Sequence, residues 1–328
     1  MAAIPQTSQP AIAGQQRGDQ YFALILRICS LVGVLLLVGL ILILFVDSLE
    51  VIGKFGIKFL TGSDWNPVAG LEEFGALPYI FGTVVTSIIA LLLATPLALG
   101  AALFVSEYAP RWLANPVAFL VELLVAIPSV AYGIWGLFVL VPIMRDHVDP
   151  FLQNTIGRLP IVGALFPRDG LVIGQDLLTA GVILTIMILP TILSISREII
   201  SQVPRLQKEG MLALGATKWE MLSTAILPYA RGGIVGAMML GLARAFGETM
   251  AVTLVIGNSS SAITPSLFTP GYTISSAIAN QFAEADTSLY FSAVVGLGLI
   301  LLFVSLVFNF IARLLVKRLT RMPGGGKA

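Results

Sequence analysis

Charged side chains that stand inside apolar stretches are the first candidates for chemistry in this sequence. Arg244 and Glu248 lie four residues apart in the run RGGIVGAMMLGLARAFGETMAVTLVIG, and Glu122 lies in another apolar run. Burying an arginine in hydrocarbon costs from about 3 to over 10 kcal/mol, so Arg244 must face a cavity or a partner. Its guanidinium carries a planar fork of N–H donors that matches the oxygens of an oxyanion. These residues therefore indicate an anion pathway, with Arg244, Glu248 and Glu122 as its candidate residues.

Two interpretations of Arg244 and Glu248 are open. In a continuous helix, Glu248 lies on the same face as Arg244 and one turn further along. In one interpretation the two form an intrahelical ion pair that only cancels its own charge. In the other, Arg244 binds a passing oxyanion, while Glu248 orients the guanidinium and keeps it from holding the anion too tightly. Glu122 is expected to pair with Arg244, to meet a helix of a partner, or to extend to the cytosolic interface.

Other kinds of chemistry lack the residues that they need. The chain has one cysteine, Cys29, and one histidine, His147, which excludes a disulfide framework and a Cys/His metal cluster within it. It contains no G-x-x-x-x-G-K-[ST] loop, so it cannot hydrolyse ATP itself. No apolar run holds a Ser or His nucleophile with a base. We therefore expect no catalytic residue, metal or cofactor in this chain, and no nucleic-acid partner is indicated.

Composition places the chain among membrane proteins. Hydrophobic residues make up 57% of its 328 residues, charged residues 11%, and the mean hydropathy is +0.93. About 20 apolar residues cross a hydrocarbon core. Runs of that length predict an all-α membrane protein with six transmembrane helices, at about 21–46, 81–105, 116–144, 171–195, 230–256 and 290–315. Residues 1–20, rich in Gln, Pro, Ala and Gly, predict a disordered cytoplasmic tail before a transmembrane domain at 21–328.

Lysine and arginine fall unevenly on the two sides of these spans. Most of them lie in the tails and connections on one side, whereas the other side has only Lys54, Lys58, Arg145, Arg158 and Arg168. The positive-inside rule then predicts that both termini and the connection at 197–228 are cytoplasmic. The outer connections are long and rich in Gly, Pro, Asn and Ser, so we expect partly ordered caps there.

Small residues recur at every fourth position in the second and fifth spans. One ridge comprises Gly82, Thr86, Ala90, Ala94, Ala98 and Ala102, and the other comprises Gly233, Ala237, Gly241, Ala245 and Thr249. Such ridges let helix backbones approach closely where the hydrophobic effect cannot drive association. They predict helix–helix packing rather than a functional site.

The cytoplasmic connection at 197–228 predicts a helix, a glycine turn and a second helix. Pro204 suits the first turn of a helix, and Gly215 suits its left-handed end. The residues Thr217-Lys218-Trp219-Glu220 fit a capping box that begins a second short helix. Lying parallel to the membrane, these helices would offer a protruding surface to a cytosolic protein.

This connection resembles the EAA loop of ABC-importer permeases. The resemblance rests on Glu209, Ala213, Gly215, Ala216, Trp219, Leu227 and Pro228, whereas Gly210 and Met211 stand where the family pattern has two alanines. Further stretches are similar to permeases of phosphate-specific importers, and these are Phe74–Pro78, Glu122–Gly133, Arg244–Val252 and Pro270–Ile274. The resemblance covers roughly Phe74 to Phe310.

The resemblance implies a type I ABC-importer permease in a bacterial plasma membrane, which carries inorganic phosphate inward as half of a two-permease pore. It implies a homologous permease, two copies of an ATPase subunit that binds ATP and Mg, and an external binding protein as partners. In this family the EAA loop is the ATPase-coupling loop, and a charged pair stands where Arg244 and Glu248 do. An importer of phosphonate, molybdate or sulfate, a stand-alone secondary transporter and an intramembrane enzyme are the alternatives.

Overall fold

The computed structural model describes residues 13–160, 162–168, 172–259 and 263–320 of a chain that divides into two compact units, Met1–Asp47 and Ser48–Ala328. Within the first unit, α1 (Ala13–Asp47) is an unbroken helix with apolar residues on every face from Tyr21 to Val46. Residues 13–20 of the predicted tail are helical, and residues 1–12 lie outside the described residues.

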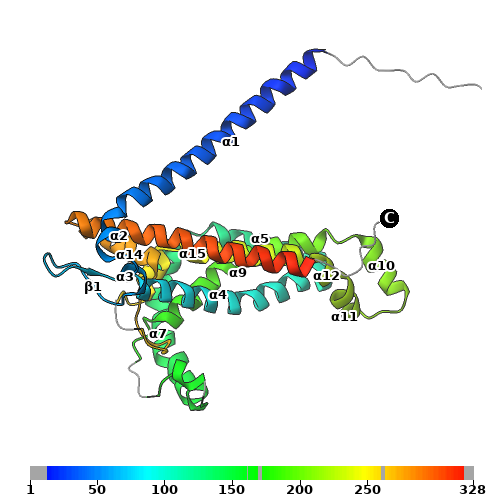
Figure 1. Cartoon of the computed structure of the whole chain (residues 1–328). Helices are drawn as coiled ribbons and strands as arrows, with labels where there is room; N and C mark the ends of the chain where they lie inside the picture. The colour runs from blue at the N-terminus through cyan, green and yellow to red at the C-terminus, as the bar shows by residue number, and fades with distance from the viewer. Residues whose placement is uncertain (1–12, 161, 169–171, 260–262, 321–328) are drawn as a thin grey trace, which may run out of the picture. The chain divides into compact units, whose positions relative to one another are not determined.

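The second unit is built around α4 (Leu77–Leu103) and α9 (Leu177–Ser201), which lie side by side (Figure 1). Ala90, Ala94, Ala98 and Ala102 of α4 are 0% exposed, which confirms the predicted ridge of small residues. Glycines let the backbones approach elsewhere, since a Cβ on Gly181 would come within 2.5 Å of the Ile89 side chain. The packing of α4 on α9 therefore depends on residues with little or no side chain.

A second small-residue contact joins α12 (Leu227–Gly247) to α9. A Cβ on Gly241 would come within 2.8 Å of the Ile192 side chain, and one on Gly233 within 2.5 Å of the Ile199 side chain. Both glycines belong to the second ridge predicted from the sequence. The helix α9 is thus packed against α4 on one side and α12 on another.

Six helices in the described part of the chain are long and apolar enough to cross a membrane, as predicted. The structure corrects the third span, because the residues expected in one helix at 116–144 form α5 (Arg111–Ala126) and α6 (Ser129–Trp135). Ile127 and Pro128 between them have extended backbones, since a proline disfavours helical geometry in the residue before it. The apolar helical run then continues to Arg158, and its parts are η2 (Gly136–Leu140), α7 (Val141–Ile143), η3 (Met144–Val148), α8 (Asp149–Asn154) and η4 (Ile156–Arg158).

The fifth span also differs from its prediction at both ends. Three elements form one run from Lys218 to Gly247, namely α11 (Lys218–Met221), η6 (Leu222–Ile226) and α12. The predicted span of 230–256 is interrupted after Gly247, and a separate helix, α13 (Met250–Val255), follows. The expected second short helix of the connection is therefore the first turn of this run, with which it is continuous.

The end of the second unit opposite α10 (Arg205–Ala213) and α11 is closed by short elements (Figure 1). They are α2 (Leu49–Phe55), α3 (Lys58–Thr61), the antiparallel strands β1 (Trp65–Asn66) and β2 (Glu73–Phe74), η5 (Val162–Leu165), α14 (Ile274–Gln281), η7 (Phe282–Glu284) and the start of α15 (Ser288–Thr320). The two strands pair with Trp65 opposite Phe74. Phe74 in turn stacks on Tyr290, with 5.6 Å between the ring centroids.

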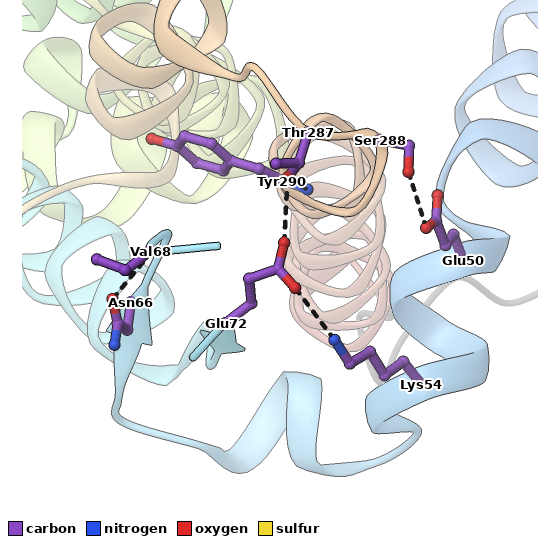
Figure 2. A network of polar contacts seen from close by, with 8 residues as sticks. All are labelled: Glu50, Lys54, Asn66, Val68, Glu72, Thr287, Ser288 and Tyr290. Carbon is purple, nitrogen blue, oxygen red and sulfur yellow. Dashed lines mark hydrogen bonds and ion pairs between the residues drawn. The ribbon is translucent and has the colours of Figure 1, made fainter. Parts of the chain in front are cut away.

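Polar contacts hold this end together (Figure 2). Glu72 accepts hydrogen bonds from Lys54 and Thr287, at 3.3 and 3.2 Å, and Ser288 donates to Glu50 at 3.0 Å. These bonds join α2, the β-hairpin and the start of α15, which are far apart in the sequence. The described parts of the connections at this end thus form a cap, which the sequence predicted to be partly ordered.

A buried carboxyl group stands at the N-terminus of α9. Asp176 is 0% exposed, and its Oδ1 accepts the Thr179 N–H at 2.8 Å, whereas its Oδ2 has no hydrogen-bond partner among the described residues. Burial raises the pKa of Asp176 to about 6. Because the folded state binds this proton more tightly than the unfolded state, ionisation of Asp176 lowers stability as the pH rises from about 4 through about 6.

Replacing Asp176 with Asn is expected to stabilise the protein near neutral pH, because the amide oxygen can still accept the Thr179 N–H while the charge is lost. The change in pKa from 3.8 to about 6 corresponds to about 3 kcal/mol at most. Thermal unfolding of the purified protein should show a larger gain at about pH 7.5 than at about pH 5. Asp176→Ala, which loses the helix cap, is the control. Equal gains in thermal stability for Asp176→Asn at both pH values would contradict the raised pKa of Asp176.

Candidate functional site

The guanidinium of Arg244 lies where α12 meets α9. Arg244 is in the last turn of α12 and is half-buried, and its Nη1 donates a hydrogen bond to Thr191 Oγ1 of α9 at 3.3 Å. The C-terminal end of a helix carries a partial negative charge, which stabilises a cation there. Tyr132 of α6 is within electrostatic reach of the same guanidinium. Arg244 is therefore a positive charge held at the contact of α12 with α9.

The helix that carries Arg244 ends one turn later, inside the apolar stretch. Glu248 has an extended backbone, with a ψ of 125°, and α13 begins at Met250. The carbonyl oxygen of Phe246, freed by this break, accepts a hydrogen bond from Ser275 Oγ of α14 at 2.8 Å. Irregular backbone at membrane depth is tolerated where protein groups satisfy it or where it lines a cavity.

The break changes the relation of Glu248 to Arg244. Glu248 Oε1 accepts the Ala251 N–H at 3.4 Å, so this carboxylate caps the first turn of α13. Among the described residues, ion pairs within 4.0 Å join only Lys54 to Glu72, Arg145 to Asp146 and Lys208 to Glu107. The expected placement of Glu248 on the face of Arg244 is thus wrong, since it required a continuous helix. The intrahelical ion pair does not form in this structure.

Glu122 lies on α5 and makes no ion pair with Arg244. Its side chain is exposed, and it forms no ion pair with the described residues. The expected pairing of Glu122 with Arg244 is therefore absent from this structure. Phe119, Leu120 and Leu123 beside it are exposed by 60%, 58% and 47%, so Glu122 stands on an apolar face that the second unit leaves uncovered.

The residues of the EAA-like connection form the predicted turn. Gly215 follows α10 with a φ of +84°, and Thr217 and Glu220 form the predicted capping box. Pro204 precedes α10 as its cap rather than lying in its first turn. A Cβ on Gly215 would meet no atom within 4 Å, so this position requires glycine for its backbone conformation rather than for space.

The connection presents apolar side chains to its surroundings. Leu206 is 83% exposed, Leu214 86% and Trp219 67%. A groove of about 490 Å³ lies between α10 and the start of the fifth span, and it is lined by Leu206, Gln207, Gly210, Met211, Leu214, Thr224, Ala225, Pro228 and Tyr229. Glu209 and Ala213 are exposed on α10, Ala216 is half-buried in the turn, and Leu227 and Pro228 begin α12. Exposed apolar patches of this kind mark sites of protein–protein contact.

Sequence reasoning missed several residues of this arrangement. Thr191 lies 53 positions from Arg244, and Ser275 lies 29 positions from the carbonyl that it satisfies. Both look like ordinary small polar residues of apolar spans, and no local pattern connects them to Arg244 or Phe246. The sequence held a weak signal for the end of α12, because a glycine, Gly247, stands directly before the polar residues Glu248 and Thr249.

Together, the six apolar helices found among the described residues, a charge beside an interrupted helix and a polar connection at one end indicate a multi-pass membrane permease. The family pattern of the binding-protein-dependent transport system inner membrane component matches residues 94–321. The chain belongs to this family and, within it, to the PstC permeases. Members of this kind are non-catalytic transport subunits.

The relatives cover nearly the whole chain. The phosphate transport system permease protein PstC of Xylella fastidiosa (strain Temecula1) is 47% identical over 94% of this chain and 93% of that protein. The PstC of Mesorhizobium japonicum is 45% identical over 93% and 92% of the two chains. The probable PstC of Methanocaldococcus jannaschii is 39% identical over 84% and 86%.

Solved structures share the fold at much lower identity. A bacterial alginate ABC transporter, in complex with its alginate-bound periplasmic protein, aligns with a TM-score of 0.59 at 15% identity, over 94% of this chain and 97% of that chain. The methionine ABC transporter MetNI in an inward-facing conformation aligns with a TM-score of 0.53 at 16% identity, over 74% and 95%. The permease fold of ABC importers, predicted from the sequence, is confirmed.

Replacing Arg244 and Glu248 with Gln, singly and together, is expected to change thermal stability additively. The coupling free energy should stay below about 0.5 kcal/mol, because the two side chains share no ion pair or hydrogen bond. Arg244→Gln combined with Thr191→Val is the matched control, since the Arg244 guanidinium donates a hydrogen bond to Thr191 and their coupling should reach about 1.5 kcal/mol or more. Thermal unfolding of the purified protein measures both cycles. A larger coupling for Arg244 with Glu248 than with Thr191 would overturn the geometry described above.

Proposed function

We propose that this chain carries inorganic phosphate into the cell as one half of a two-permease pore, driven by a separate ATPase. The observation that carries the proposal is the guanidinium of Arg244, held beside a helix break by a neutral hydroxyl rather than by a carboxylate. Its relatives at 45–47% identity bear the name of phosphate transport permeases. The geometry supports anion passage, and the relatives support phosphate as the anion.

The contact of Arg244 with Thr191 suits reversible binding. A hydrogen bond from the charged guanidinium to a neutral hydroxyl contributes about 1.5–3 kcal/mol net, and an anion that accepts from the same N–H replaces it with a charge-assisted bond. The remaining guanidinium N–H groups match phosphate oxygens in pairs. A carboxylate in direct contact would have to be displaced before the anion could bind. In this proposal Glu248 acts on the pathway through the break, because it caps α13, and not as the ion-pair partner of Arg244.

The exposed face of α5 fits a second permease. A carboxylate in contact with lipid is costly, and Glu122 stands on this otherwise apolar face. A neighbouring protein helix could supply a partner for Glu122 while covering Phe119, Leu120 and Leu123. A homologous permease of the PstA type is the proposed occupant, and lipid covers the other apolar faces. Glu122 then borders the pore from its position at the interface.

The groove beside α10 fits the ATPase. Two PstB-type subunits would bind ATP and Mg, and one of them would contact Leu206, Leu214 and Trp219. A PstS-type binding protein would deliver phosphate at the opposite end. Closure of the ATPase dimer would then move α10 and the run from Lys218 to Gly247, and the pore would open alternately to each side. This chain itself would need no cofactor. Its side chains would hold the anion and transmit motion.

Reconstitution tests the proposal directly. The chain is co-purified with its second permease and ATPase, placed in proteoliposomes with the binding protein, and supplied with ATP. Phosphate uptake that requires ATP is expected, with sulfate and molybdate taken up poorly. Arg244→Gln should lower phosphate uptake about a hundredfold, because two charge-assisted hydrogen bonds are lost, and Arg244→Lys is the control that keeps the charge without the fork. Uptake without ATP would indicate a secondary transporter. Preferred uptake of another oxyanion would identify that anion, instead of phosphate, as the substrate. Full phosphate uptake by Arg244→Gln would exclude a role of Arg244 in the anion pathway.

Gly215→Val is expected to weaken binding of the ATPase subunit while the helices stay inserted. A β-branched residue at a φ of +84° costs about 1–2 kcal/mol of backbone strain, so the turn between α10 and α11 should shift. Gly215→Asn is the matched control, because asparagine tolerates left-handed geometry. Co-purification of the ATPase with each variant measures the effect. Equal recovery with Val and with Asn would argue against the docking role of this turn.

A further inference from the structure

A π-helical turn at the end of α4 contacts the cytoplasmic connection through a charged side chain. In η1 (Phe104–Tyr108), Glu107 accepts a hydrogen bond from Lys208 Nζ of α10 at 2.5 Å, and the two side chains are only 11% and 18% exposed. Lys208 Nζ also lies 3.5 Å from the carbonyl oxygen of Ile200, in the last turn of α9. Lys208 therefore joins α10 to the ends of both central helices.

The next residue of η1 makes a separate contact with α11. The Nζ of Lys218 lies over the Tyr108 ring, 5.2 Å from its centroid. Cation–π contacts of this length are attractive by about 0.5–1 kcal/mol at exposed sites. Two adjacent residues of η1 thus contact the two helices of the connection: Glu107 contacts α10, and Tyr108 contacts α11. The two interactions are separate. Neither residue belongs to the EAA-like pattern.

These contacts link α10 and α11 to the end of α4, to which neither helix is adjacent along the backbone. Along the backbone, α10 is joined to α9 before it and to α11 after it, and α4 is remote from both in sequence. Yet α4 packs on α9 through Ala90, Ala94, Ala98 and Ala102, with no long side chains between the backbones to absorb movement. The contact of Lys208 with Glu107 therefore gives a displacement of α10 a direct route to α4 through η1.

We propose that Glu107 and Lys208 are positioning residues for transport, which transmit the movement of α10 to α4, with Tyr108 and Lys218 as a second contact in the same joint. The proposal rests on the ATP-driven function proposed above. Breaking a largely buried pair leaves a charge without its partner, so each single neutral variant should disturb the joint more than exchange of the two charges does. Neither Glu107 nor Lys208 is among the residues that line the groove beside α10.

The test measures phosphate imported per ATP hydrolysed in the reconstituted complex. Glu107→Gln and Lys208→Gln should each lower this ratio by about fivefold or more while ATP hydrolysis continues. The double exchange Glu107→Lys with Lys208→Glu should restore most of it. Glu198→Gln is the matched control, because Glu198 is an exposed carboxylate at the same end of α9 and has no ion pair among the described residues. For the second contact, Tyr108→Leu should lower the ratio and Tyr108→Phe should not.

Each outcome decides the proposal. Unchanged ratios in both single variants would overturn it, and so would a double exchange that assembles but stays uncoupled. If the single variants do not assemble, Tyr108→Leu decides, since a lowered ratio supports the joint and an unchanged ratio overturns it. Failure of the proposed function would appear separately, because the unmodified complex would then import no phosphate with ATP.

Discussion

Close backbone approach along α9 is the constraint on which the rest of the structure depends. Lipid is as apolar as leucine, so helices in a membrane gain little by hiding apolar side chains from it, and they associate where small residues allow dense packing. Here the alanines of α4 and the glycines Gly181, Gly233 and Gly241 bring three helices together. This packing sets the distance between Thr191 on α9 and Arg244 on α12, and so fixes the position of the charge.

The irregular backbone around this charge follows from the same constraint. A helix can end inside a membrane only where other groups satisfy the freed carbonyls, and Ser275 does so for Phe246. Because α12 ends at Gly247, Glu248 accepts a hydrogen bond from the Ala251 N–H of α13 instead of pairing with Arg244. The break thus separates two charges that a continuous helix would have paired. An arginine left with a neutral hydroxyl keeps its capacity to bind an anion, which an internal ion pair would have reduced.

Much of this arrangement could be predicted from local patterns. The six spans follow from apolar length, the ridges from small residues at every fourth position, and the turn of the connection from Gly215 and the capping box at Thr217. Each of these signals lies within a few residues of the feature that it predicts. The break between α5 and α6 had a signal as well, since Pro128 stands there, although apolar continuity across it favoured one long helix. The apolar length of a run shows that it can cross the membrane, but it does not show whether the helix is continuous.

The contacts on which the two proposals rest could not be predicted in this way. The Arg244–Thr191 and Lys208–Glu107 contacts join residues 53 and 101 positions apart, and single charges or hydroxyls carry no mark of a distant partner. Their relation appears only when the packing is known, because the first joins α12 to α9 and the second joins α10 to η1 at the end of α4. From the connection, one path runs along the unbroken backbone from Lys218 to Gly247 and ends at Arg244. The other path crosses from Lys208 to η1 and enters α4. Because α4 and α12 both pack on α9, one movement of α10 would act on two helices around the site. The close packing of small residues between these helices would transmit the movement rather than absorb it.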